Sequence, residues 1–355
     1  MTEKEGIFVS ICIPTYHRTE YVRGAIQCCL DQTYPHFEVI ISDDSAHDEI
    51  RKVAESFHSE KIRYFKNNPP LGISRKLNDF LDKAVGNWMV ILCDDDLFEP
   101  EYLATLVAHL RRHPEATLAR CRYKLMDADG QIRRLDVETP VVLGPFEHLS
   151  RIFLPNREML TMNITGVLFP KELMKKMGGF KDLYEGLHLD RIAWAELGVE
   201  GLSICDPAPL CRVRIHTGSV SAASFRIDYE QRISAVMGAK AAIEKLLERM
   251  SGRTRSNEDE RNLDLAKKNS LAYIDRSLRA ATDKNLIAIL SQQKENILPE
   301  VEKVFNKMKG LSPRPFRSAR IYRMLSFMPL PIRIFFLGII KKKKLKNFGN
   351  LLKES

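Results

Sequence analysis

Residues 88–96 read Trp88-Met89-Val90-Ile91-Leu92-Cys93-Asp94-Asp95-Asp96, an apolar run that leads directly into three consecutive carboxylates. The apolar part predicts a buried strand, so the acids are expected at its carboxyl end, where open α/β sheets bind their ligands. Adjacent carboxylates repel one another unless a cation or a set of donors offsets their charge. The stretch is therefore a candidate metal site. The alternative is an acidic cap on the helix that begins near Pro100.

Composition predicts a globular protein whose basic charge lies at one end. The 355 residues are 44% hydrophobic, which is enough for one large domain or two smaller ones, and the net charge is +9. Residues 312–355 hold eleven basic residues against one acidic residue, whereas the first 311 residues hold 44 basic and 45 acidic residues. The body is nearly neutral, so we expect no nucleic-acid partner.

Cysteine usage and the termini favour a cytoplasmic protein. The seven cysteines are odd in number and show no metal-ligand spacing, which fits a reduced compartment. The N-terminus leads into a strand without a long apolar signal segment. No run approaches the roughly 18 apolar residues that a membrane-spanning helix needs.

Apolar runs alternate with helical periods through the first hundred residues. Strands are expected at 8–13, 37–42 and 62–65 as well as in the opening stretch, with a helix between each pair. The order predicts an α/β, Rossmann-like fold with a mostly parallel sheet, right-handed crossovers and flanking helices.

The pattern changes in the second half of the chain. We expect a hairpin turn at 127–130, an irregular segment from 131 to 160, and further strands at 161–169, 202–205 and 211–215. Past residue 226 only long helical periods follow. The predicted organisation is a domain over residues 1–225, a helical region over 226–311 and a basic amphipathic tail over 312–355.

Several short motifs between residues 7 and 225 occur in one order. They are Ile13-Pro14-Thr15-Tyr16-His17-Arg18, Gln32-Thr33-Tyr34-Pro35, Val39-Ile40-Ile41-Ser42-Asp43-Asp44-Ser45, Asn68 to Asn78, Leu92-Cys93-Asp94-Asp95-Asp96 with Pro100, Gly178-Gly179-Phe180, Asp190 with Trp194, and Arg214-Ile215-His216 with Ser219. Each is weak alone, but together they resemble the family 2 glycosyltransferases. The resemblance implies the nucleotide-diphospho-sugar transferase (GT-A) fold and sugar transfer from a nucleotide donor.

A divalent cation is implied because the leaving diphosphate carries negative charge that a carboxylate-held metal can neutralise. By resemblance Asp95 is the expected ligand of Mn²⁺ or Mg²⁺, and Asp96 assists the metal or holds the local backbone. His216 resembles a family histidine near the metal, although a structural histidine is the alternative. Asp94 is expected to face the ribose. Arg75 would reach the base or diphosphate, or else it is an exposed helical arginine.

The resemblance also implies a pocket for the nucleotide base. Asp44 is expected to accept a hydrogen bond from the imide N–H of uracil, with Asp43 as the weaker candidate. A helix or turn cap is the alternative role for both acids. Pro14 and Tyr16 are expected to line the pocket.

Inverting transfer needs a general base that removes the proton of the acceptor hydroxyl. Asp190 is the candidate, because it precedes Trp194 by four residues as the family base does; a helix cap is the alternative. Leu189 stands where the family commonly has an acid. Cys93 and residues 45–47 also depart from the family pattern, which bears on metal dependence and donor choice.

The tail over residues 312–355 mixes apolar side chains with arginines and ends its longest apolar run at Lys341–Lys344. This pattern is typical of an interfacial anchor on an anionic membrane. The alternative is a tail that packs on the body or stays disordered.

The hypothesis is an inverting hexosyltransferase peripherally attached to the cytoplasmic membrane. It would move a sugar from a UDP-linked donor to a hydroxyl of a glycan or lipid-linked glycan in cell-surface polysaccharide synthesis. One rival is a non-catalytic relative that acts as an assembly partner, which the acids at positions 44, 95 and 190 argue against. A nucleotidyltransferase is the other, and no glycine-rich triphosphate loop follows the first strand.

Overall fold

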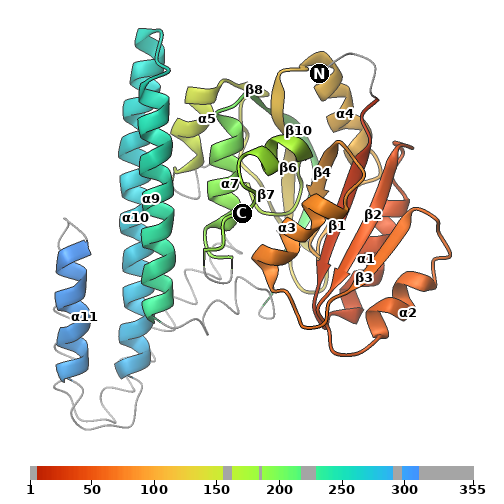
Figure 1. The fold of residues 1–355 in the computed structure, drawn as a ribbon, viewed down its shortest axis with the longest axis horizontal. Helices are drawn as coiled ribbons and strands as arrows, with labels where there is room; N and C mark the ends of the chain where they lie inside the picture. Colours follow the sequence, from red (N-terminus) through yellow and green to blue (C-terminus); the bar gives the residue numbers. More distant parts are fainter. Residues whose placement is uncertain (1–5, 155–161, 184–185, 217–228, 291–297, 312–355) are drawn as a thin grey trace.

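The computed structural model describes residues 6–154, 162–183, 186–216, 229–290 and 298–311. Figure 1 shows a twisted sheet flanked by helices, with a pair of long helices standing beside it next to α5 and α7. The tail over residues 312–355, with its predicted membrane anchor, lies outside the described residues.

The first half of the chain forms the parallel part of the sheet, in the order β3-β2-β1-β4. Its strands are β1 (Val9–Thr15), β2 (Phe37–Asp43), β3 (Ile62–Lys66) and β4 (Trp88–Ile91). The crossover helices are α1 (Thr19–Leu30), α2 (Glu49–Glu55) and α3 (Ile73–Lys83). Every residue of β1, β2 and β4 is buried, as continuous apolar runs predict for central parallel strands. The predicted order of elements is confirmed here.

The second half adds antiparallel strands, so the sheet is mixed, although β10 pairs with β6 in parallel. From β4 the order continues β9-β6-β10-β5, and β9 runs antiparallel to both β4 and β6. The elements are β5 (Leu97–Phe98), α4 (Tyr102–Arg112), β6 (Ala116–Met126), β7 (Ile132–Leu135), β8 (Val142–Leu143), α5 (Pro145–Ile152), β9 (Val167–Pro170), α6 (Lys171–Lys176), α7 (Leu189–Gly198) and β10 (Leu202–Arg214). Strand direction here depends on long-range pairing, which no local pattern encodes.

Two local expectations were wrong. In the segment from 131 to 160, the described residues 131–154 are not irregular, because β7, β8 and α5 fall among them; the two strands are too short to give a periodic signal. The two closing strands are one strand, β10, whose pairing with β6 shifts register between Asp206 and Cys211. Pro207 and Pro209 lie in that interval, and proline cannot donate to a strand ladder, so the sequence reads as a break.

The helical region packs onto the α/β part through apolar side chains. Its helices are α9 (Tyr229–Ser251), α10 (Asn257–Leu290) and α11 (Leu298–Leu311). Ile233 of α9 and Leu278 of α10 belong to the same buried core as Trp194 of α7. Within the described ranges, no helix has the length and apolar character needed to span a bilayer. A boundary near residue 225 stays a prediction about folding units.

Candidate active site

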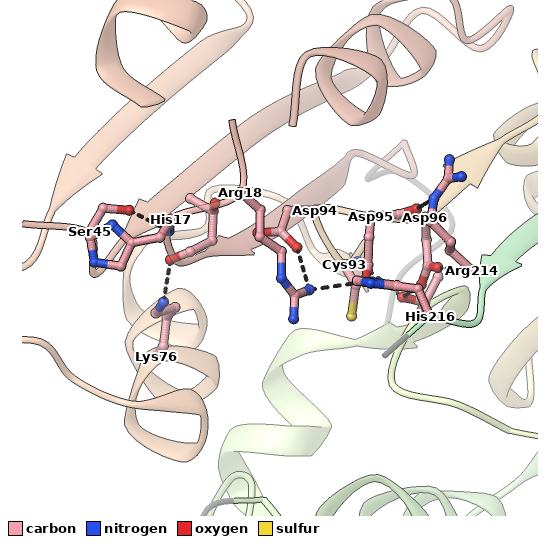
Figure 2. Close-up of polar contacts among 12 residues, drawn as sticks. His17, Arg18, Ser45, Lys76, Cys93, Asp94, Asp95, Asp96, Arg214 and His216 are labelled. Atoms are coloured by element: carbon pink, nitrogen blue, oxygen red, sulfur yellow. Dashed lines mark hydrogen bonds and ion pairs between the residues drawn. The ribbon is translucent and has the colours of Figure 1, made fainter. Parts of the chain in front are cut away.

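The three acids after β4 lie at the carboxyl edge of the parallel strands, as predicted, and all three are buried. Arg18, in the loop after β1, offsets part of their charge. Its Nη1 lies 3.1 Å from Oδ1 of Asp94 and 3.0 Å from Oδ2 of Asp95. Figure 2 shows these groups in one row along the edge, from Ser45 at one end to Arg214 at the other, with Lys76 below the row.

Asp95 is the middle residue of the acid row, which consists of Asp94, Asp95 and Asp96. Nε2 of His216 lies 2.8 Å from its Oδ2, and Nε of Arg214 donates to its backbone oxygen at 2.9 Å. The chain therefore brings residues 121 positions apart into direct contact. His216 contacts the acid row, as the motif order predicted. Its role toward a metal stays a prediction.

Asp96 connects the acid row to two other parts of the fold through hydrogen bonds. Its Oδ2 accepts a hydrogen bond from the Thr165 hydroxyl at 2.6 Å, and its Oδ1 accepts one from the Arg214 backbone N–H at 2.7 Å. Burial, with the charge of Asp95 next, raises the pKa of Asp96 to about 8. Asp96 thus holds the local backbone in this structure, which is one of its two expected roles.

The donor set fits a hard divalent cation. One ligand atom each from Cys93, Asp95 and Asp96 lies within 4.8 Å of the others. Carboxylate oxygens are the ligands that Mg²⁺ and Mn²⁺ prefer. Burial raises the pKa of the Cys93 thiol well above its usual range, so the carboxylates are the better ligands. Burial also raises the pKa of Asp94 to about 6 although Arg18 opposes this shift, and a cation at this edge would favour the ionised carboxylate.

Asp44 lies at the end of β2 with its carboxylate already surrounded by donors. Asn67 and the backbone N–H of Leu71 donate to Oδ1, and the backbone N–H of Gly72 donates to Oδ2. Nζ of Lys76 lies 3.0 Å from the same Oδ2. These contacts fill both oxygens, so a hydrogen bond to uracil requires one donor to move. The uracil role stays a prediction, and here Asp44 holds the loop that leads into α3.

Lys76 is a site residue that the sequence reasoning missed. Its side chain is only 4% exposed, and its Nζ also donates to the backbone oxygen of Thr15 at 2.9 Å. Burial raises the pKa of Asp44, but Lys76 and the loop donors outweigh burial and hold it below its ordinary value. The one sequence signal was a lysine next to Leu77 on the apolar face of α3.

Lys76→Met should destabilise the protein, because it leaves a buried carboxylate without its cation. Breaking such a pair typically costs about 3 to 5 kcal/mol of unfolding free energy. Arg75→Met is the matched control, since Arg75 is exposed on the same helix. Denaturant unfolding of the two variants decides the point. Equal unfolding free energies would show that Lys76 contributes nothing to Asp44.

The other predicted donor-site residues differ in exposure. Pro14 is buried at the end of β1, whereas Tyr16 is 59% exposed and its ring meets the ring of His17 edge to face. The backbone N–H of His17 donates to Ser45 Oγ at 2.8 Å, which joins the loops after β1 and β2. Among the described residues, no hydrogen bond or ion pair joins Arg75 to the acid row.

Asp190 is the second residue of α7 and lies far along the chain from the three acids after β4. Its Oδ1 accepts a hydrogen bond from the backbone N–H of the next residue, Arg191, at 2.7 Å, and α7 has no side-chain cap hydrogen bond at its N-terminus. Burial raises the pKa of Asp190 above its ordinary value, and Arg191 opposes this shift. A carboxylate with a raised pKa is a better general base near neutral pH.

A comparison with protein-family models identifies the family of the part of the chain that carries the acid row. The family model described as glycosyl transferase family 2 matches residues 10–177, a span that includes the parallel strands and all three acids after β4. This part of the chain belongs to glycosyltransferase family 2. The enzyme class of the chain is therefore glycosyltransferase.

Curated relatives match this chain over part of their length. An uncharacterized glycosyltransferase of Rickettsia typhi is 27% identical over 209 residues, which cover 59% of this chain and 64% of that protein. The GalNAc(5)-diNAcBac-PP-undecaprenol beta-1,3-glucosyltransferase of Campylobacter jejuni is 27% identical over 129 residues, covering 36% of this chain and 41% of that protein. The chain thus spans less than two thirds of each of these two relatives.

Solved structures show that the chain has the GT-A fold. TarS 1-349 of S. aureus in complex with UDP-GlcNAc aligns with a TM-score of 0.55 at 14% identity, covering 90% of this chain and 89% of that chain. The mannosyltransferase PcManGT from Pyrobaculum calidifontis in complex with GDP-Man and Mn²⁺ aligns with a TM-score of 0.50 at 16% identity, covering 95% and 87%. At these identities the likeness concerns the fold alone.

Proposed function

We propose that this glycosyltransferase moves a sugar from a UDP-linked donor to a hydroxyl of a cell-surface glycan or its lipid-linked precursor, with inversion. The observation that carries the proposal is the convergence of Asp94, Asp95 and His216 at the carboxyl edge of β4. That edge is where an α/β sheet binds a ligand, and its buried acids suit a metal–diphosphate group.

Asp95 and Asp96 would hold the divalent cation, with His216 beside them. When bound, the cation supplies positive charge that neutralises the leaving diphosphate. Arg18 lies against Asp94 and Asp95 and is the protein's own positive charge at the same edge. Asp94 would hold the ribose, and Tyr16, which is exposed, would contact the base. Arg75 would approach the diphosphate from α3.

Asp190 would take the proton of the acceptor hydroxyl as that oxygen attacks the anomeric carbon. The pair of electrons of the sugar–phosphate bond then leaves with the diphosphate, on the opposite face of the sugar. The raised pKa of Asp190 supports this role, since a stronger base accepts the proton more readily.

A panel of nucleoside diphosphates tests the donor class. The support for UDP is the UDP-GlcNAc complex of the similar TarS structure, whereas PcManGT holds GDP-Man. Calorimetric titration with UDP, GDP and ADP, each with Mn²⁺ and with EDTA, should give the tightest binding for UDP with Mn²⁺. Tighter binding of GDP would move the proposal to GDP-linked donors, and binding of no diphosphate would contradict it.

The acceptor class rests on the name of the Campylobacter relative, which acts on an undecaprenol-linked glycan. We extend that acceptor chemistry, a sugar hydroxyl carried on a lipid diphosphate, to this chain. A peripheral position at the cytoplasmic membrane would bring such an acceptor within reach.

The basic tail gives a separate prediction about the membrane. Full-length protein should co-sediment with anionic vesicles and be partly released by high salt, because each lysine or arginine near the surface adds about 1 kcal/mol that salt screens. A chain ending at Leu311 should stay in the supernatant and still bind UDP. Equal sedimentation of the two chains, or none by the full-length chain at low salt, would rule out the anchor.

A further inference from the structure

The turn that enters α7 has an unusual backbone. His188, two residues before Asp190, has a φ of 62° and so lies in the left-handed region. A residue with a side chain seldom adopts this conformation unless its surroundings hold it there. The direction in which α7 begins, and hence the placement of Asp190, depends on that residue.

The contact that holds His188 comes from the helical region. Tyr273 of α10 forms a hydrogen bond between its hydroxyl and Nδ1 of His188, and the two rings meet edge to face with centroids 5.5 Å apart. Tyr273 also contacts Arg191, the residue that follows Asp190. Cζ of Arg191 lies 4.9 Å from the centroid of the Tyr273 ring. One tyrosine therefore contacts residues on both sides of Asp190.

α10 is itself fixed to the α/β part close to these contacts. The buried amide of Asn269 donates to the backbone oxygen of Ser150 in α5 at 2.8 Å. Arg276 donates to the backbone oxygen of Phe153 at 3.1 Å, and the rings of Phe153 and Tyr273 have centroids 5.4 Å apart. In Figure 1, the pair formed by α9 and α10 stands beside α5 and α7. Tyr273 is thus presented to the turn from a rigid support.

The contact is uncharged near neutral pH. Burial, with Arg191 next, lowers the pKa of His188 to about 4, and burial raises the pKa of Tyr273 to about 12. A neutral imidazole next to the base adds no positive charge that would weaken it. Its function in the site is geometric.

We propose that Tyr273 is a positioning residue, which orients Asp190 through His188 and Arg191 and makes the helical region part of the catalytic apparatus. The proposal rests on the proposed role of Asp190 as the base. It predicts that α10 controls the rate of transfer without contacting the donor.

Tyr273→Phe tests the proposal, because it removes the hydroxyl and keeps the ring under Arg191. The kcat should fall about tenfold or more, since small misplacements of a catalytic group are costly, while the donor KM and the affinity for UDP stay unchanged. Tyr102→Phe is the matched control. Its hydroxyl on α4 is also buried and has no hydrogen-bond partner in the described structure, so its loss should leave kcat unchanged.

A second variant covers the case in which Tyr273→Phe folds poorly. His188→Asn keeps a residue that tolerates the left-handed conformation but shortens the side chain that reaches Tyr273. It should also lower kcat, and the double variant should be no slower than the slower single variant, because both changes remove one interaction. Circular dichroism and melting temperature report folding for each.

The outcomes separate this inference from the proposed function. Wild-type kcat in Tyr273→Phe, while Asp190→Asn is nearly inactive, would overturn the inference alone. A changed donor KM at constant kcat, or multiplicative losses in the double variant, would also overturn it. Wild-type turnover in Asp190→Asn would instead remove the base assignment on which the inference rests.

Discussion

Asp190→Asn is expected to lower the transfer rate by roughly 10²- to 10⁴-fold while donor affinity changes little. The amide oxygen can still accept the N–H of Arg191, as the carboxylate does near the start of α7, so the fold should persist. The amide cannot take a proton from the acceptor hydroxyl. Initial rates at saturating donor, measured beside calorimetric UDP affinity, decide between base and cap.

The pH dependence of the wild-type rate gives an independent check on the same residue. Asp190 acts only when it is deprotonated, so activity should fall as pH drops through its pKa. Because burial raises that pKa, the acidic limb of the pH–rate profile should lie at higher pH than for an ordinary carboxylate.

Wild-type-like turnover in Asp190→Asn would refute the base assignment and leave Asp190 as a helix cap.

Asp95→Ala is expected to abolish the metal-dependent binding of UDP. The change removes the carboxylate that both Arg18 and His216 contact, and it takes one ligand from the candidate metal group. Titration of UDP with Mn²⁺ and with EDTA should then give the same weak binding, whereas wild type should bind more tightly with the metal.

Asp206→Ala is a matched control for Asp95→Ala, because Asp206 forms the same kind of pair, with Nε2 of His109 at 2.7 Å from its Oδ2, elsewhere in the fold. Its UDP binding should retain the full dependence on Mn²⁺. If folded Asp95→Ala protein keeps the affinity for UDP and its dependence on Mn²⁺, the metal role is wrong and helix capping is the better account of the three acids.

The sequence predicted the parts of the site that a local pattern encodes. The run from Trp88 to Asp96 combines a buried strand with acids at its end, and the parallel order of the first four strands follows from alternating strands and helices. These features placed the acid row at the correct edge. The antiparallel insertion of β9 could not be predicted, because its partners are chosen by tertiary pairing.

The hydrogen-bond partners of the site residues could not be predicted from the sequence, for the same reason. Thr165 lies 69 residues from Asp96, and Tyr273 lies 85 residues from His188, so no spacing connects either pair. Arg18 was visible within a motif, but its charge gained a role only when the loop after β1 met the end of β4. Long-range contacts of this kind hold the groups that local motifs supply.

The most direct test of the central claim is the release of UDP from a panel of UDP-sugars by wild-type protein, with Mn²⁺ and with EDTA. The acid row predicts release from at least one donor that requires the metal, rises when a lipid-linked glycan acceptor is added, and is lost in Asp95→Ala. Release from no UDP-sugar under any of these conditions, or a rate that EDTA leaves unchanged, would contradict metal-dependent transfer at this edge.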